Sequence, residues 1–278
     1  MNINWEAKSL AFQCIDALSL HKTLYFVQRN LTRRSHIDIS TGYRYWMIHC
    51  NNLASLECPE VFEFGAGKNL AQNIFLSQWF RSQTAVDLYP MLNIDLMNEA
   101  AEQISIRFPS NVYHAMANIA DLERNYNIRY IAPLDASRTP FDDDSFDACI
   151  STDTLEHIPE DSILAIFREL RRIVRPDGLI SSVIDYSDHY SYTDKHIGPL
   201  NCLQFTAAEF EKHNHSVHYQ NRLRHYDYAR MFAALGFRTL KKEAVDFVPL
   251  PVRIAPEFDP SEPSLSALRG IFLLQNTK

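Results

Sequence analysis

Residues 61–69 read VFEFGAGKN, and this short stretch decides the fold. Its first four residues have the character of a buried strand, and Gly-Ala-Gly follows without a break. Glycines directly after an apolar strand are typical of nucleotide-binding turns, because they let the backbone approach a ligand closely. The turn alone does not identify the nucleotide or cofactor.

Apolar and amphipathic runs alternate after this turn. The apolar runs predict strands at 61–65, 82–88, 128–134, 146–151 and 178–185. The amphipathic runs predict helices at 68–80, about 95–107 and 161–174. This alternation predicts parallel strands joined by helical crossovers, hence a doubly wound α/β sheet of the Rossmann-like kind.

The last part of the chain follows a different pattern. A helix over 221–237 is expected to end at Gly236, a suitable residue for the position after a helix. Two strands follow, at about 237–247 and 268–276, with no helical pattern between them. We therefore expect an antiparallel pair at one edge of a mostly parallel, seven-stranded sheet.

The predicted organisation is a helical cap over 1–58 and one domain over 59–278. Residues 1–58 show helical periodicity and no convincing strand. Within the domain, residues at about 186–220 interrupt the alternation directly after a strand. An insertion at the carboxyl end of a strand lies at the binding crevice of such a sheet, so we expect it to face the substrate.

Composition narrows the choice of partners. The chain has 27 Lys and Arg against 34 Asp and Glu, and an acidic surface repels phosphate backbones and anionic lipid. The five cysteines are odd in number and form no CxxC pair, which is typical of reduced thiols in the cytoplasm. No signal peptide and no membrane-length apolar run stands out. We expect a cytoplasmic protein with a small-molecule substrate, without nucleic acid or membrane insertion, and a homodimer stays open.

The residues after the turn leave two classes of protein open. The dinucleotide fingerprint is GxGxxG, with an acid about twenty residues later for the ribose. Gly65 and Gly67 match the first two glycines, whereas Leu70 replaces the third. Asp87, at the end of the second predicted strand, supplies the acid. A dehydrogenase and a methyltransferase both fit these residues.

Four further features distinguish the two classes. They are Glu63, two residues before the first glycine, and the stretches LDASRTPFDDDSFDACIS (134–151), TDTLEHIPE (152–160) and ELRRIVRPDGLISSV (169–183). Together they resemble the class I S-adenosylmethionine-dependent methyltransferases, in particular the small-molecule, type 11 branch that includes quinone-biosynthesis methyltransferases. The resemblance covers residues 60–185 well and the remainder weakly. It departs from the family at Asn69, where a third glycine is common.

The resemblance implies which residues hold the methionine and ribose parts of the cofactor, S-adenosylmethionine. Gly65, Ala66 and Gly67 would let the backbone approach the methionine part. Glu63 would support that turn and face a cationic ligand. Asp87 would accept hydrogen bonds from both ribose hydroxyls, which suits the two oxygens of a carboxylate.

The resemblance also implies contacts around adenine and the transferred methyl group. Asp135 would accept from the adenine amino group, and the backbone NH of Ala136 would address a ring nitrogen. Leu88 is a further expected cofactor contact. Ser151 and His157 would lie near the methionine part.

An alcohol acceptor calls for a base, because its oxygen loses a proton during methyl transfer. Histidine titrates in the right range, and His189 follows the fifth predicted strand. We predict His189 as the general base, oriented by Asp185, with His157 as a second catalytic candidate. The alternative, a polar loop histidine without a chemical role, stays open for each histidine.

Aromatic and basic residues in and after the insertion are candidates for substrate binding: Tyr190, Tyr219, Arg222 and Arg224. Aromatic side chains suit a sugar, and arginines suit a phosphate or carboxylate. The stretch HYQNRLRHYDYARMFAALGF (218–237) is weakly similar to methyltransferases of bacterial surface-polysaccharide pathways. The alternative is a helix that packs one face on the core and turns both arginines to solvent.

Three histidines, His213, His215 and His218, form an HxHxxH pattern. A zinc site needs a clearer ligand set, and no carboxylate accompanies these histidines at helical spacing. We therefore expect a hydrated helix face here and no metal ion in the protein.

These observations predict an S-adenosylmethionine-dependent methyltransferase. Its predicted reaction is O-methylation of a small polar metabolite, such as a sugar or nucleotide sugar in carbohydrate biosynthesis. Three alternatives stay open: an N- or C-methyltransferase, an NAD-dependent dehydrogenase, and a non-catalytic binding protein on the same fold.

Overall fold

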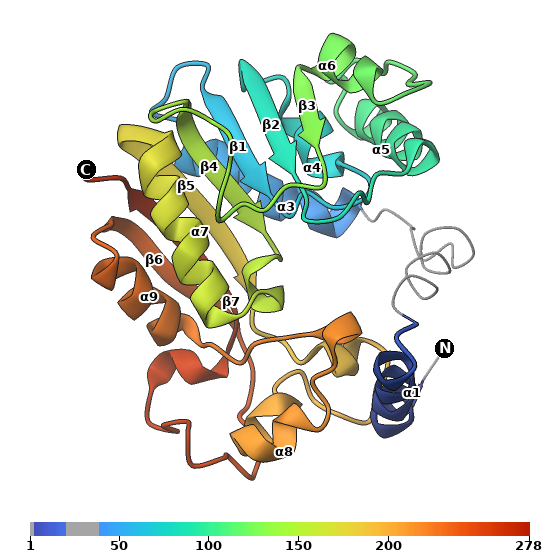
Figure 1. Ribbon diagram of the computed structural model, residues 1–278, viewed down its shortest axis with the longest axis vertical. Helices are drawn as coiled ribbons and strands as arrows, with labels where there is room; N and C mark the ends of the chain where they lie inside the picture. The colour runs from blue at the N-terminus through green and yellow to red at the C-terminus, as the bar shows by residue number, and fades with distance from the viewer. Residues whose placement is uncertain (1–2, 21–38) are drawn as a thin grey trace.

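Seven strands form one sheet in the order β3-β2-β1-β4-β5-β7-β6 (Figure 1). The structure is a computed structural model that describes residues 3–20 and 39–278. Five neighbouring strands, from β3 to β5, are parallel, and β7 pairs antiparallel with both β5 and β6. The strands are β1 (Glu60–Phe64), β2 (Ser82–Val86), β3 (Ile128–Ile131), β4 (Phe146–Thr152), β5 (Val174–Asp185), β6 (Arg238–Phe247) and β7 (Ala267–Gln275). The predicted sheet and its antiparallel edge are confirmed.

Helices cover both faces of the sheet. One apolar cluster joins one face to α3 (Ile39–Asn52), α4 (Ala71–Leu76), α5 (Ile94–Arg107) and α6 (Ala120–Tyr126). A second cluster joins the other face to α7 (Glu160–Ile173) and α9 (His225–Ala234), which lie in front in Figure 1. Burial on both faces explains why the central strands are apolar runs rather than alternating ones.

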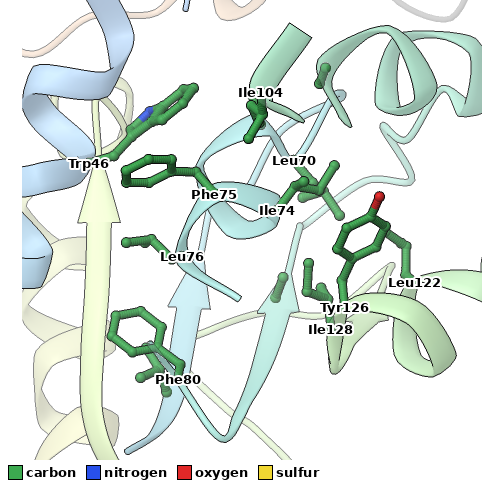
Figure 2. Close-up of a cluster of buried hydrophobic side chains, with 14 of the residues drawn as sticks. Trp46, Leu70, Ile74, Phe75, Leu76, Phe80, Ile104, Leu122, Tyr126 and Ile128 are labelled. Carbon is green, nitrogen blue, oxygen red and sulfur yellow. The ribbon is translucent and has the colours of Figure 1, made fainter. Parts of the chain in front are cut away.

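The first cluster anchors the helix that follows the glycine turn (Figure 2). The ring centroids of Trp46 in α3 and Phe75 in α4 lie 5.4 Å apart. Phe75 also packs edge-to-face on Phe108, at 4.9 Å. Burying a side chain such as that of Phe75 stabilises the fold by roughly 2–3 kcal/mol. The glycine turn therefore rests on a fixed helix, and α3 is held beside it.

Two of the predicted helices are shorter than expected, and α6 has no counterpart among the predicted elements. Leu70 adopts a φ of 48° in the left-handed region, so α4 begins only at Ala71 and its predicted first turn is a loop. α9 begins at His225 because Asn221 is used elsewhere: its side-chain amide donates to two backbone carbonyls in the segment after β4. α9 ends before Gly236, whose φ of 82° is the conformation expected there.

The insertion after β5 consists of short helices and loops. These helices are η2 (His189–Tyr192), η3 (Asn201–Gln204), α8 (Ala207–Glu211) and η4 (Ser216–His218). The amino-terminal helix α1 (Trp5–Ala17) contacts η4 and lies beside the insertion in Figure 1, apart from α3. Residues 21–38 of the predicted cap lie outside the described residues.

The HxHxxH histidines hold α1 in place. The hydroxyl of Ser9 lies 2.9 Å from Nδ1 of His213 and 3.0 Å from Nε2 of His215. The ring of His218 stacks on Phe12, with centroids 5.0 Å apart. Residues 213–218 are thus not the hydrated helix face that the sequence predicted. They are irregular and pack against α1.

Candidate active site

The glycine turn leaves backbone exposed to a ligand. Gly65 and Gly67 have φ angles of 74° and 79°, in the left-handed region that favours glycine. A Cβ on Gly65 would lie 2.2 Å from Cγ2 of Thr154, so only glycine fits there. A Cβ on Gly67 would have no heavy atom of the described residues within 4 Å, so these residues leave the space beside it open.

A cavity of about 390 Å³ adjoins the turn. Four residues predicted from the sequence line it: Glu63, Gly65, Ala66 and Gly67. Gln72 at the start of α4 and Trp46 of α3 line it as well, together with Thr152 at the end of β4 and Asp153 after it. Sequence reasoning missed Trp46 because nothing local shows that α3 folds onto this turn, and it missed Gln72 because the direction of this side chain depends on where α4 begins.

Asp87 lies at the end of β2, directly against the turn. Its carboxylate accepts hydrogen bonds from the amide of Gly67, at 3.1 Å and 3.3 Å, and from the hydroxyl of Tyr130, at 2.8 Å. Burial raises its pKa to about 6, against the effect of these two donors. A carboxylate has roughly four acceptor positions, so that of Asp87 can still accept hydrogen bonds from the hydroxyls of a ligand.

Glu63 is 4% exposed and points toward α4. It accepts hydrogen bonds from the side-chain amides of Gln72, at 2.9 Å, and Asn73. Burial raises the pKa of Glu63 to about 8, against these hydrogen bonds, and the charge of Asp87 adds to the rise. A cationic ligand in the cavity would favour the ionised form of Glu63 and gain from it.

A chain of buried hydrogen bonds connects α3 to Glu63. Burial lowers the pKa of His49 to about 3, so its ring is neutral and carries one proton. Thr152 donates to Gln72 at 2.8 Å, so Nε2 of His49, 2.8 Å from the Thr152 hydroxyl, must be the protonated nitrogen. Nδ1 of His49 then accepts from Ser181, also at 2.8 Å. The hydrogen bonds therefore run in one direction, from β5 through α3 and β4 to the glutamate.

This environment predicts a pH dependence of stability. The ordinary pKa of Glu63 is 4.5, so between pH 4.5 and about 8 the folded protein holds a proton that the unfolded chain has lost. Stability must fall as the pH rises through this window. We expect wild type to lose about 2–4 kcal/mol more than Glu63→Gln between pH 5 and 8, in urea unfolding. Glu123→Gln, on the exposed side of α6, is the control; parallel curves for wild type and Glu63→Gln would contradict the assignment.

The predicted adenine-side residues lie next to Asp87 along the sheet edge. The amide of Leu134 donates to the carbonyl of Asp87 at 2.9 Å and brings the following segment to the end of β2. Asp135 is exposed, and its carboxylate accepts from the amide of Ser137 at 2.8 Å in an Asx turn. Ala136 is buried. Leu88, exposed after β2, is placed at the same edge.

The residue of β4 that faces the cavity is Thr152, and Ser151 is fully buried in the sheet. Successive side chains of a strand point to opposite faces, so adjacent residues cannot both line the same cavity from within the strand. The expected contact of Ser151 with the methionine part is therefore misplaced by one residue. Only the register of the sheet shows which of the two residues faces the turn.

The predicted catalytic residues come together beyond the carboxyl ends of β4 and β5. The rings of His157 and His189 lie 4.7 Å apart, and Nε2 of His189 lies 3.6 Å from Oδ2 of Asp185. That separation suits an ion pair but exceeds a hydrogen bond. Burial opposes ionisation of Asp185, yet His189, Tyr192 and Arg269 hold its pKa below the ordinary value. The predicted orientation of His189 by Asp185 stays a prediction.

Acidic residues and one arginine complete this cluster. Glu156, adjacent to His157, is 2% exposed, and burial raises its pKa well above the ordinary value. Asp153, which lines the cavity, pairs with Arg269 of β7. The guanidinium of Arg269 lies 4.0 Å from the ring centroid of Tyr45 in α3. Sequence reasoning missed Glu156 and Arg269, since their positions depend on segments distant in the chain.

The four residues predicted to bind the substrate mainly contact other parts of the protein itself. Arg224 is 1% exposed and donates to the carbonyls of Tyr186, Leu265 and Ala267, so it is neither at the surface nor free to contact a substrate. The others hold the insertion together through backbone carbonyls: Arg222 donates to Cys202 and Phe205, Tyr190 donates to His213, and the carbonyl of Tyr219 accepts from His157. A buried guanidinium requires such partners, which sequence alone does not reveal.

Comparisons with known proteins agree with this geometry. A family model described as a methyltransferase domain matches residues 62–182. The Burkholderia thailandensis 1,6-didemethyltoxoflavin-N1-methyltransferase, solved with 1,6-didemethyltoxoflavin and S-adenosylhomocysteine, has a TM-score of 0.53 at 15% identity, over 94% of this chain and 89% of that chain. A chain of the complex between the Haloferax volcanii Trm112 methyltransferase activator and a methyltransferase has a TM-score of 0.50 at 16% identity, over 96% and 98%. These likenesses show a shared fold.

Residues 62–182 thus belong to the class I S-adenosylmethionine-dependent methyltransferases. The protein is an enzyme that carries this domain, and its cofactor is S-adenosylmethionine. The open turn, the cavity and the carboxylates of Glu63 and Asp87 fit that cofactor. A sequence search of curated proteins found no match. Within residues 3–20 and 39–278, no helix combines the length and apolarity that crossing a bilayer requires.

Proposed function

We propose that this methyltransferase acts on a hydroxyl oxygen of a small polar metabolite, with sugars and nucleotide sugars as the candidate class. The main support for the proposal is a polar cluster beyond the cavity, in which Glu156, Asp185 and His189 are buried and His157 lies exposed beside them. An apolar acceptor would gain nothing from such groups, whereas a hydroxyl that loses its proton needs them.

The residues around the cavity have separate tasks in this proposal. Gly67 admits the cofactor, Asp87 binds its ribose, and Asp135 with the amide of Ala136 addresses its adenine. When bound, S-adenosylmethionine supplies a methyl group, whose carbon–sulfur bond breaks with the electron pair going to sulfur. The acceptor oxygen takes up this carbon and loses its proton.

The cluster provides the groups that handle that proton. Nε2 of His189 is buried and has no hydrogen-bond partner among the described residues, so it is available to an acceptor hydroxyl. Oδ2 of Asp185 lies 3.6 Å from this nitrogen, so the carboxylate faces the imidazole on the side of the proposed proton transfer. His189 is thus the proposed general base of the reaction.

The proposal is tested by product analysis with a panel of nucleotide sugars, free sugars and amines. We expect transfer of labelled methyl to a hydroxylated acceptor, with a carbon chemical shift typical of O-methyl. His189→Ala should lower kcat about 100-fold, because proton transfer by a positioned side chain contributes roughly 100- to 10,000-fold. His196→Ala, exposed in the same insertion, is the matched control. Methyl on nitrogen or carbon would instead support the N- or C-methyltransferase alternative.

A further inference from the structure

We propose that Glu156, His157 and His189 bind a divalent transition-metal cation, which activates the acceptor hydroxyl. Each residue offers one ligand atom, and these atoms all lie within 4.8 Å of one another. Ligands about 2.0–2.2 Å from one cation are separated by at most about 4.4 Å, so a small adjustment brings the three atoms into coordination. The inference deepens the proposed function, on which its chemical role rests.

Unpartnered buried atoms point to a ligand at this place. Both carboxylate oxygens of Glu156 and Nε2 of His189 are buried without a hydrogen-bond partner among the described residues. Leaving a buried polar atom unpaired is costly, and a buried carboxylate is costlier still. One cation would satisfy all three atoms at once.

His157 is oriented as a metal ligand would be. Its Nδ1 lies 2.9 Å from the backbone carbonyl of Tyr219, and a carbonyl can only accept. Nδ1 therefore carries the proton, and Nε2 presents a lone pair. Metal-binding histidines almost always donate the other ring NH to a carbonyl or carboxylate in this way, which fixes the tautomer and the ring.

The charge around the cluster also favours a dication. The carboxyl groups of Glu156, Asp153 and Asp185 interact with one another through space. Arg269 supplies a positive charge here, and it is paired with Asp153. A cation between the two segments would face the three carboxyl groups of Asp153, Asp185 and Glu156 together with this one arginine.

The ligand types narrow the choice of metal. One carboxylate and two imidazoles suit Mn²⁺, Fe²⁺, Co²⁺ or Zn²⁺ better than Ca²⁺, which prefers oxygen ligands alone. Three protein ligands leave positions open for an acceptor hydroxyl. Asp153 lines the cofactor cavity and lies three residues before Glu156, so the cation would lie beside the cofactor.

The chemical role follows from the open position. A hydroxyl bound to the cation has a lower pKa and releases its proton to a solvent base, and its oxygen then accepts the methyl carbon. Nε2 of His189 is in this case a ligand and not the general base, since one lone pair cannot serve both. The inference departs from the expectation of a metal-free protein, because the ligands lie on two segments that only the fold brings together.

The test is metal binding by the full-length protein, separately from catalysis. Protein freed of metal with a chelator is titrated with Mn²⁺, and free Mn²⁺ is followed by electron paramagnetic resonance. We expect one Mn²⁺ per chain, and an affinity at least about 30-fold lower for Glu156→Gln and for His189→Ala. Glu160→Gln, exposed at the start of α7, should bind as wild type. S-adenosylmethionine is titrated into the same samples, so that each variant is shown to be folded.

The outcomes separate the two proposals. Wild type that binds S-adenosylmethionine but not Mn²⁺ overturns the metal site and leaves His189 as the proposed base. Mn²⁺ binding that survives in folded Glu156→Gln and His189→Ala also overturns it, because the cation then lies elsewhere. Mn²⁺ binding that these variants lose, with no methyl transfer to any hydroxyl under Mn²⁺, supports the site and contradicts the O-methylation proposal.

Discussion

Asp87→Ala is expected to weaken the binding of S-adenosylmethionine about 1,000-fold. The variant removes a carboxylate that would accept from two ribose hydroxyls, and each hydrogen bond to a charged group is worth about 1.5–3 kcal/mol. Two such bonds correspond to roughly 100- to 10,000-fold in affinity. Calorimetric titration with S-adenosylmethionine, S-adenosylhomocysteine and NAD measures the effect directly, and no binding of NAD is expected.

Two further variants separate ribose binding from support of the turn. The Asp87 carboxylate also holds the amide of Gly67 and the hydroxyl of Tyr130, so its loss could act through the turn. Tyr130→Phe removes one of these contacts and keeps the acceptor, so its affinity should change by no more than about threefold. Asp142→Ala, on the exposed loop before β4, is the control for a lost negative charge. Wild-type affinity in Asp87→Ala would refute the assigned role.

Gly65→Ala is expected to destabilise the fold, whereas Gly67→Ala is expected to prevent binding of the cofactor. The new Cβ at Gly65 would lie 2.2 Å, 2.6 Å and 3.0 Å from the Cγ2, Oγ1 and Cβ atoms of Thr154. Together with the positive φ, this overlap should lower the free energy of unfolding by roughly 2–5 kcal/mol. A Cβ at Gly67 would have no heavy atom of the described residues within 4 Å. Gly67→Ala should therefore lower the free energy of unfolding only by the cost of the positive φ, about 1–2 kcal/mol. Gly67→Ala should fold but lose S-adenosylmethionine, because its methyl group lies beside the cavity.

A double variant tests whether overlap with Thr154 causes the larger loss of stability in Gly65→Ala. Thr154→Gly removes the three atoms that the new Cβ would overlap, so Gly65→Ala/Thr154→Gly should recover much of the stability lost by Gly65→Ala. The positive φ of 74° remains, so recovery should be incomplete. Urea unfolding measures stability, and calorimetry measures cofactor binding. Equal destabilisation by alanine at both glycines would contradict the packing argument.

The residues of the glycine turn could be predicted because they are local. Glu63, Gly65 and Gly67 lie on one strand and its turn and line the cavity, whereas the cofactor contacts of Asp87 and Asp135 stay predictions. The acceptor half was not predictable in the same way. The sequence indicated His157 and His189, but it did not indicate that the Glu156 carboxyl group beside them has no hydrogen-bond partner within residues 3–20 and 39–278. The cytoplasmic location and the helical cap over 1–58 stay predictions, and the homodimer stays open.

The sequence by itself determined the order of the seven strands along the chain, the antiparallel edge and the glycine turn after β1. These features depend on hydrophobic periodicity and on glycine, which act over a few residues. The tertiary structure decided that Thr152 rather than Ser151 lines the cavity, and that Arg224 is buried on three carbonyls. It also decided which acids and histidines meet beyond the sheet. The reason is physical: side-chain direction on a strand, burial and pairing of charge depend on neighbours that are distant in the chain.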